Sequence, residues 1–100
     1  MTAHIDIPMD EITAFCARWK IVEFSLFGSV LREDFGPDSD VDVLVTFGPD
    51  ADWGLLDRVE MVEQLKDIFG RSADMAVEKN LKNPFRRKEI LRTKEVVYAA

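Results

Sequence analysis

The sequence predicts an α+β fold with α/β-type layers: a small mixed β-sheet flanked by helices, in a single domain spanning residues 1–100. Apolar residues recur every three or four positions in some segments, as in helices, and every second position in others, as in strands. The two kinds of segment follow one another along the chain. With 47% hydrophobic and 32% charged residues, 100 residues are enough to bury a core.

The first part of the chain predicts a helix and then a strand. The helix is indicated by apolar residues at helical spacing, namely Met9, Ile12, Cys16 and Trp19. Cys16, the only cysteine, is assigned to the core side of this helix. Residues 21–27 are mostly β-branched or aromatic and predict a strand that ends at Gly28. A short helix or turn is expected over 29–33.

A second strand and the longest helix follow a loop that contains Gly-Pro. Apolar residues alternate with polar ones over 40–47, which predicts the strand. The helix is indicated by a stripe that steps by three and four: Leu55, Val59, Val62, Leu65 and Phe69. Gly70 is placed to end it. A third strand is expected over 73–77, with Asp74 on the face opposite its apolar residues.

The end of the chain predicts one more helix, opened by Asn83-Pro84, and a short closing strand over 96–98. Charge changes sign here: residues 1–78 carry a net charge of −11, and residues 79–100 carry +5. The basic residues are Lys79, Lys82, Arg86, Arg87, Lys88, Arg92 and Lys94. Two interpretations stand, a solvated helix face, which is favoured, and a docking surface for nucleotide phosphates or an acidic partner.

Composition also argues against several classes of protein. The net charge of −6 argues against direct, bulk binding of nucleic acid. A single cysteine excludes an intramolecular disulfide, which suits a reducing, cytoplasmic location. No stretch approaches the ~18 apolar residues of a membrane span, so no membrane association is expected.

Two aspartates at the start of the second strand predict a metal site. Asp40 and Asp42 share one face of the strand, about 6.6 Å apart along it, and would repel each other without a cation. Asp74 supplies a third carboxylate if the second and third strands are neighbours. Mg²⁺ prefers such carboxylates together with water and phosphate oxygens. The alternative, a helix cap or a solvated strand end, suits a lone acid better than this set.

The turn at Gly28-Ser29 predicts the phosphate half of the same site. Gly28 allows close approach of a phosphate to the backbone, and N–H groups at a helix start point toward an anion. The Ser29 hydroxyl adds a donor, and Arg32 can add a charge-assisted hydrogen bond. Alone, Gly-Ser is a weak signal; its place before Asp40-Val41-Asp42 gives it weight.

Other metal and nucleotide motifs fail on specific positions. Asp38-x-Asp40-x-Asp42 resembles the start of a calcium loop, but Val43 and Pro49 stand where that loop needs Gly and Glu. Neither a P-loop nor a G-x-G-x-x-G fingerprint occurs. His4 is the only histidine, so zinc sites and His-based triads have little to build on.

The assembled motifs resemble the minimal nucleotidyltransferase (MNT) family of the DNA polymerase beta-like superfamily. The resemblance rests on Gly28-Ser29, Ser39-Asp40-Val41-Asp42 and Ala73-Asp74-Met75 and covers the chain from about Ile12 to Tyr98. It implies the nucleotidyltransferase fold and transfer of a nucleoside monophosphate, usually from ATP, to an acceptor hydroxyl. Asp40, Asp42 and Asp74 would be catalytic and would bind two Mg²⁺ ions, and Gly28, Ser29 and Arg32 would bind the nucleotide.

Two positions depart from the family pattern Gly-Ser-Arg-Ala-Arg-Gly. Val30 replaces the first arginine and Glu33 replaces the last glycine, whereas Arg32 is kept. A lost arginine and an added acid near the triphosphate would weaken nucleotide affinity. The three acidic positions are intact, so activity is still expected.

The resemblance also implies a biological role. Family members of this size act as antitoxins paired with a HEPN-domain toxin, and a type VII-like antitoxin adenylylates a tyrosine of that toxin. This protein adenylyltransferase is the first hypothesis, with a hetero-oligomer as the expected assembly. The second is a non-catalytic antitoxin that masks its toxin by complex formation. Transfer to a small molecule such as an aminoglycoside ranks last.

Overall fold

Helices and strands follow one another in the predicted order. The computed structural model describes residues 5–33 and 35–100, so the prediction on His4 lies outside the described residues. The longer elements are α1 (Met9–Trp19), β1 (Ile21–Phe27), β2 (Val41–Phe47), α2 (Leu55–Phe69), β3 (Ala73–Val77), α3 (Pro84–Thr93) and β4 (Glu95–Ala99). Two short 3₁₀ turns are η1 (Gly28–Leu31) and η2 (Glu78–Asn80). The closing strand is thus two residues longer than expected.

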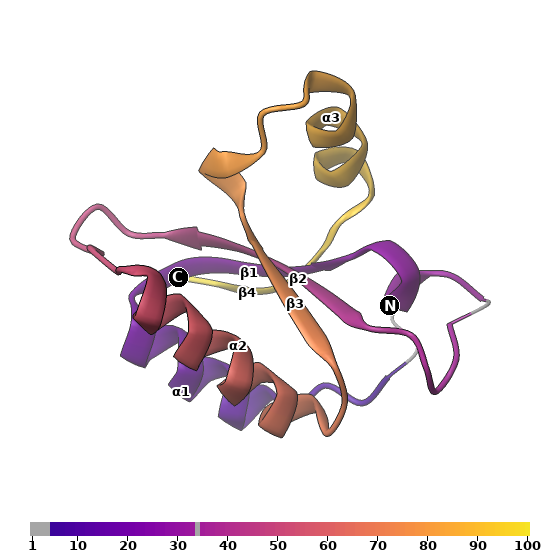
Figure 1. Cartoon of the computed structure of the whole chain (residues 1–100), viewed down its shortest axis with the longest axis horizontal. Coiled ribbons are helices and arrows are strands. Elements are labelled where there is room, and N and C mark those ends of the chain that lie inside the picture. Colours follow the sequence, from indigo (N-terminus) through magenta and orange to yellow (C-terminus); the bar gives the residue numbers. More distant parts are fainter. Residues whose placement is uncertain (1–4, 34) are drawn as a thin grey trace.

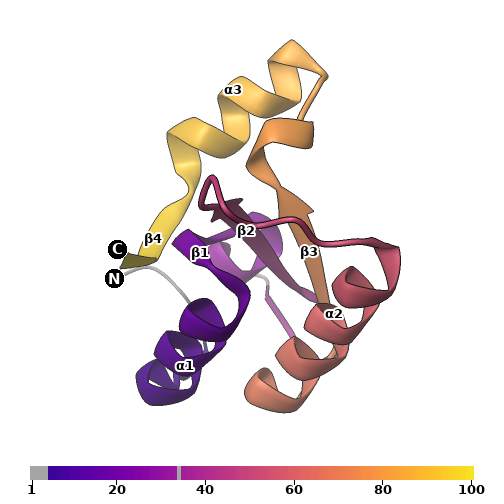
Figure 2. The same ribbon diagram turned by 90° about the vertical axis from the view of Figure 1, so that its left-hand side faces the viewer.

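The strands form one mixed sheet in the order β3-β2-β1-β4. β1 pairs antiparallel with β2 and with β4, whereas β2 and β3 run parallel, joined by α2. Helices α1 and α2 lie side by side against one face, and α3 stands over the other (Figures 1 and 2). The predicted α+β fold, a small mixed sheet flanked by helices, is confirmed.

The main core lies between the sheet and the pair α1 and α2. It is built from inward-facing residues of β1 and β2, such as Phe24, Leu26 and Val43, packed against α1. Trp19 of α1 links the two helices, because its Nε1 donates a hydrogen bond to Oε1 of Gln64 on α2 at 2.9 Å. Cys16 lies in this core as predicted, and burial raises the pKa of its thiol to about 12, which keeps the thiol protonated.

The apolar stripe that predicted α2 is only partly buried. The helix has the predicted extent, and Gly70 caps it in the left-handed conformation. Its fully buried residues, however, are Met61 and Leu65, while Leu55 and Val59 are mostly exposed. The side that faces α1 and the sheet is fixed by Met61 and Leu65, and Val59 lies about 200° around the helix from Met61.

The opposite face of the sheet has a much smaller apolar cluster. Here Ile90 of α3 packs with Phe27 and Leu44. Helix α3 starts where predicted, with the Asn83 side chain accepting hydrogen bonds from the first-turn N–H groups and Pro84 in the first helical position. Ion pairs hold the helix at both ends, Arg87 with Glu78 at 2.9 Å and Lys94 with Glu23.

Candidate active site

The sheet register brings the predicted aspartates to one place. Asp42 of β2 is the direct partner of Asp74 in the parallel pairing with β3. On its other side, Asp42 is paired with Phe27, the last residue of β1, so the Gly28 turn begins beside it. Asp40 stands just before β2, two residues from Asp42. The expectation that the second and third strands are adjacent in the sheet is thus confirmed.

Asp42 carries negative charge that the surrounding residues do not balance. Burial, followed by the nearby charges of Asp74 and Asp40, raises the pKa of the Asp42 carboxyl above its ordinary value. Arg86 and Arg32 act in the opposite direction and lower it. The net effect is a carboxylate that is costly to ionise without a further cation.

Gly28 is required by the approach of Asp42 as well as by its own backbone. Its φ is +75°, in the left-handed region that favours glycine. A Cβ at this position would lie 2.5 Å from Oδ2 of Asp42. Because glycine has no side chain, the turn can pass directly beside the Asp42 carboxylate without a clash.

Ser29 and its neighbours are divided between the site and the core. The Ser29 hydroxyl donates to the backbone carbonyl of Asp40 at 3.2 Å, which ties the turn to the start of β2. Arg32 is close enough for its charge to act on Asp42. Val30, in contrast, is fully buried in the main core, and Glu33 is exposed. The arginine position of the family pattern is thus used for packing in this chain.

The donor set fits a divalent cation, although the side chains do not close around one. Asp74 uses Oδ1 to accept a hydrogen bond from the N–H of Met75 at 3.0 Å. Within residues 5–33 and 35–100, no three His, Cys, Asp or Glu side chains are grouped closely enough to hold a metal ion. The fit rests on chemistry. Hard carboxylate donors lie at one end of the sheet, and the nearby arginines do not balance the negative charge around Asp42.

Arg86 is a site residue that the sequence did not single out. The sequence favours a solvated face for the basic run that contains Arg86, yet the Arg86 charge acts on Asp42 from the same side of the sheet. The Arg87 bridge to Glu78 and the Asn83 cap fix the first turns of α3, which carry Arg86. This proximity depends on the docking of α3 over the aspartates, which the sequence pattern alone does not show.

Comparison with known proteins gives the chain its family. A family model described as the nucleotidyltransferase domain matches residues 11–97. The chain belongs to this family. The match includes the turn at Gly28 and the three aspartates Asp40, Asp42 and Asp74. The resemblance to nucleotidyltransferases expected from the sequence is confirmed, and this nucleotidyltransferase is an enzyme of the transferase class.

Individual relatives agree with the family assignment. Protein adenylyltransferase MntA from Thermococcus cleftensis is 37% identical over 81 residues, which cover 81% of this chain and 77% of the relative. A solved structure of a proposed minimal nucleotidyltransferase is 31% identical, with a TM-score of 0.71, over 94% of this chain and 96% of that one. A toxin–antitoxin structure with AMP-PNP shares the fold at 15% identity, with a TM-score of 0.74, over 93% and 74% of the two chains.

Proposed function

We propose that this nucleotidyltransferase is a Mg²⁺-dependent protein adenylyltransferase that transfers AMP from ATP to a hydroxyl, a tyrosine of a partner HEPN-domain toxin, and so acts as an antitoxin. The observation that carries the proposal is the in-register pair Asp42 and Asp74 beside the Gly28 turn, with uncompensated charge on Asp42. A relative named protein adenylyltransferase MntA and a related toxin–antitoxin fold with AMP-PNP support the choice of nucleotide and partner.

In this proposal each site residue has a distinct role. Asp40, Asp42 and Asp74 would hold the metal, and Gly28, Ser29 and Arg32 would bind the triphosphate. When bound, the divalent cation neutralises phosphate charge and polarises the α-phosphoryl group. Positioning and charge neutralisation by these residues would supply most of the catalysis.

The chemical step needs one base and an in-line arrangement. A bond forms between the acceptor hydroxyl oxygen and the α-phosphorus, and the bond from that phosphorus to the bridging oxygen breaks, releasing pyrophosphate. Asp74 would take the hydroxyl proton, and its position on β3, at the sheet edge next to Asp42, supports this role. Arg86 would stabilise negative charge on the phosphates from the α3 side.

The surface of the molecule is compatible with a protein as acceptor. Residues 1–78 carry a net charge of −11, which suits a basic, RNA-binding partner. Three large aliphatic side chains on α2, those of Leu55, Leu56 and Val59, are exposed by 78%, 84% and 53%. A cluster of this kind is typical of a protein contact.

Label transfer tests the proposal directly. The chain is incubated with Mg²⁺ and the protein encoded next to it, with ATP labelled on the α- or, separately, on the γ-phosphate. We expect protein-bound α label, no γ label, and no label with the Asp40→Asn/Asp42→Asn variant. An Asp50→Asn/Asp67→Asn variant changes the same charge at exposed positions and should behave as the unmodified chain.

The same assay decides between catalysis and masking. The buried Val30, in the place of an arginine, is the observation that keeps a non-catalytic antitoxin open. Absence of α label from a partner that still forms a stable complex would favour masking and reject adenylyl transfer. Loss of toxin neutralisation in the Asp40→Asn/Asp42→Asn variant, with binding intact, would reject masking.

A further inference from the structure

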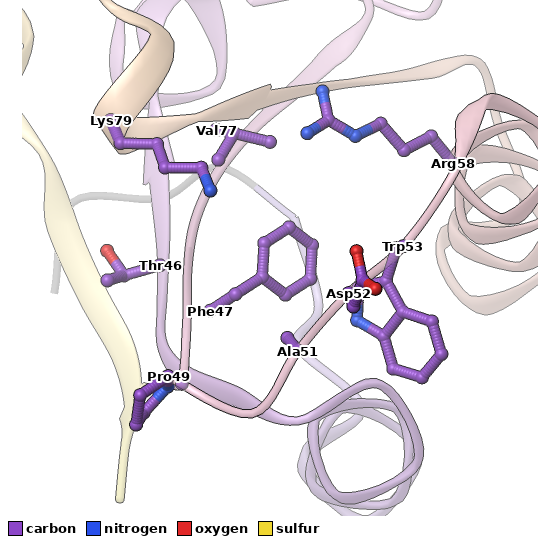
Figure 3. A pocket seen from close by; sticks show the side chains of 10 residues that line it. Thr46, Phe47, Pro49, Ala51, Asp52, Trp53, Arg58, Val77 and Lys79 are labelled. Atoms are coloured by element: carbon purple, nitrogen blue, oxygen red, sulfur yellow. The ribbon is translucent and has the colours of Figure 1, made fainter.

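A cavity, separate from the aspartate site, lies at the other end of β2 and β3. Its volume is about 330 Å³, within the range of small-molecule sites. It is framed by the end of β2, the loop that leads into α2, α2 itself, the end of β3 and η2. The residues that matter for its chemistry are Phe47, Asp52, Trp53, Arg58, Val77 and Lys79 (Figure 3).

The aromatic wall of this cavity is held in place. Trp53 donates from Nε1 to the backbone carbonyl of Trp19 at 2.8 Å, and the two indoles meet edge to face with centroids 5.1 Å apart. The loop itself is fixed because the N–H of Gly48 donates to the carbonyl of Lys20 at 2.8 Å. The cavity is therefore preformed, which lowers the entropic cost of binding.

Two cations enter the cavity from opposite sides. In the view of Figure 3, Arg58 from α2 and Lys79 from η2 extend from opposite sides of the cavity, with Val77 between them and the Phe47 ring below both. Among the described residues, neither side chain forms an ion pair, whereas cations such as Arg18, Arg87 and Lys94 do. Asp52 is the one carboxylate in the lining, so the cavity carries excess positive charge in a chain of net charge −6.

This cavity is separate from the aspartate site. Thr46, at its rim, is four residues beyond Asp42, about 13 Å along the strand. Between them on the α3 side, Leu44 is 2% exposed and packs against Ile90. The filled space prevents one small ligand from lying across both places on this face.

We propose that this cavity is a second ligand site, which binds a nucleoside monophosphate. The phosphate would lie between Arg58 and Lys79, and the base would pack on Phe47 and Trp53. A phosphate monoester carries about −1.5 to −2 charges at neutral pH, which matches two cations better than a carboxylate does. Base–aromatic packing gives a role to the two rings that line the cavity beside the cations. The inference does not rest on the proposed function, because the two sites share no residue.

Binding of AMP without divalent cation tests the proposal. AMP is titrated in EDTA by calorimetry and by the change in tryptophan fluorescence, since Trp53 lines the cavity. Each of Arg58→Gln and Lys79→Gln should weaken binding about tenfold, the effect of one charge-assisted hydrogen bond. Lys82→Gln is the matched control, an exposed lysine three residues beyond Lys79 and outside the lining, and should bind AMP normally.

Three outcomes would overturn the proposal. One is no AMP binding up to millimolar concentration by a chain whose circular dichroism shows it folded. Another is binding that is lost in Asp42→Asn but kept in Arg58→Gln, which would place AMP at the aspartate end. A third is equal affinity for inorganic phosphate, which would remove any role for the rings. Unchanged AMP affinity in Asp42→Asn, together with the expected losses, supports the second site whether or not adenylyl transfer occurs.

Discussion

The face of the sheet under α1 and α2 buries a continuous set of apolar side chains, whereas the face under α3 places carboxylates beside a small apolar cluster. On the first face, Phe24, Leu26 and Val43 point into a dry core. On the second, Asp42 and Asp74 stand next to each other in register. Stability is thus concentrated on one side, and this allows the other side to keep like charges close together.

Replacing Asp42 by asparagine should separate stability from activity most strongly. Nucleotidyl transfer should fall roughly a thousandfold or more, since a charge partner for the phosphates is lost. In EDTA, the free energy of unfolding should rise by about 0.5–2 kcal/mol, because the cost of burying the Asp42 charge and its repulsion with Asp74 and Asp40 are both removed. Label transfer and thermal unfolding measure the two effects.

The pH dependence of this gain follows from the sign of the pKa shift. The pKa of Asp42 is raised in the folded chain, so its ionisation costs stability at neutral pH. That cost disappears as the pH falls through the folded pKa to the unfolded value of about 3.9. The advantage of Asp42→Asn should therefore be present at pH 7 and vanish below pH ~4. An equal advantage at both pH values would contradict the charge of Asp42, buried and beside like charges, as the cause.

Truncating a buried side chain on one face should mainly lower stability, whereas truncating one on the other face should also lower nucleotidyl transfer. Phe24→Ala should cost about 3–5 kcal/mol of stability, because Phe24 is fully buried in the main core. Ile90→Ala should cost nearer to about 2 kcal/mol, since its cluster is small, yet it should lower nucleotidyl transfer more, because α3 carries Arg86. Urea unfolding and transfer rates at low temperature, where both variants are folded, test this.

Phe24→Leu supplies a milder variant if the alanine does not fold. It should lower stability and leave the transfer rate of the folded chain unchanged. A larger loss of stability in Ile90→Ala than in Phe24→Ala would reverse the assignment of the two faces.

The sequence was sufficient to predict the elements and the aspartate set, because both are local signals. Alternation places Asp74 opposite its apolar neighbours, and the parallel register then brings it to Asp42. The orientation of α2 was not predictable in the same way. Leu55, Val59 and Leu65 all fit one helical stripe, but packing buries only Leu65 of these three, together with Met61 from outside the stripe. Packing partners, rather than spacing, decide between two apolar sides of a helix.

Two further features depend on contacts between distant segments. The need for glycine at position 28 arises from the Asp42 carboxylate as well as from the turn, and no local pattern contains that contact. Likewise, the cavity of the proposed second site joins Lys79 to Arg58 and Trp53, which lie on three different segments. In both cases the chemistry is set by tertiary approach, which composition and periodicity do not encode.

The smallest effect is expected for Arg86, and it tests whether α3 belongs to the site. Arg86→Gln should raise KM for the nucleotide about two- to fivefold, since an exposed charge is well screened by water. The effect should shrink at high salt because the Debye length becomes shorter. Steady-state kinetics at two ionic strengths measure both trends. Arg92→Gln on the same helix, whose arginine already pairs with Glu89 at 2.8 Å, is the matched control. An equal change in both variants would indicate bulk charge rather than the position of Arg86 over Asp42.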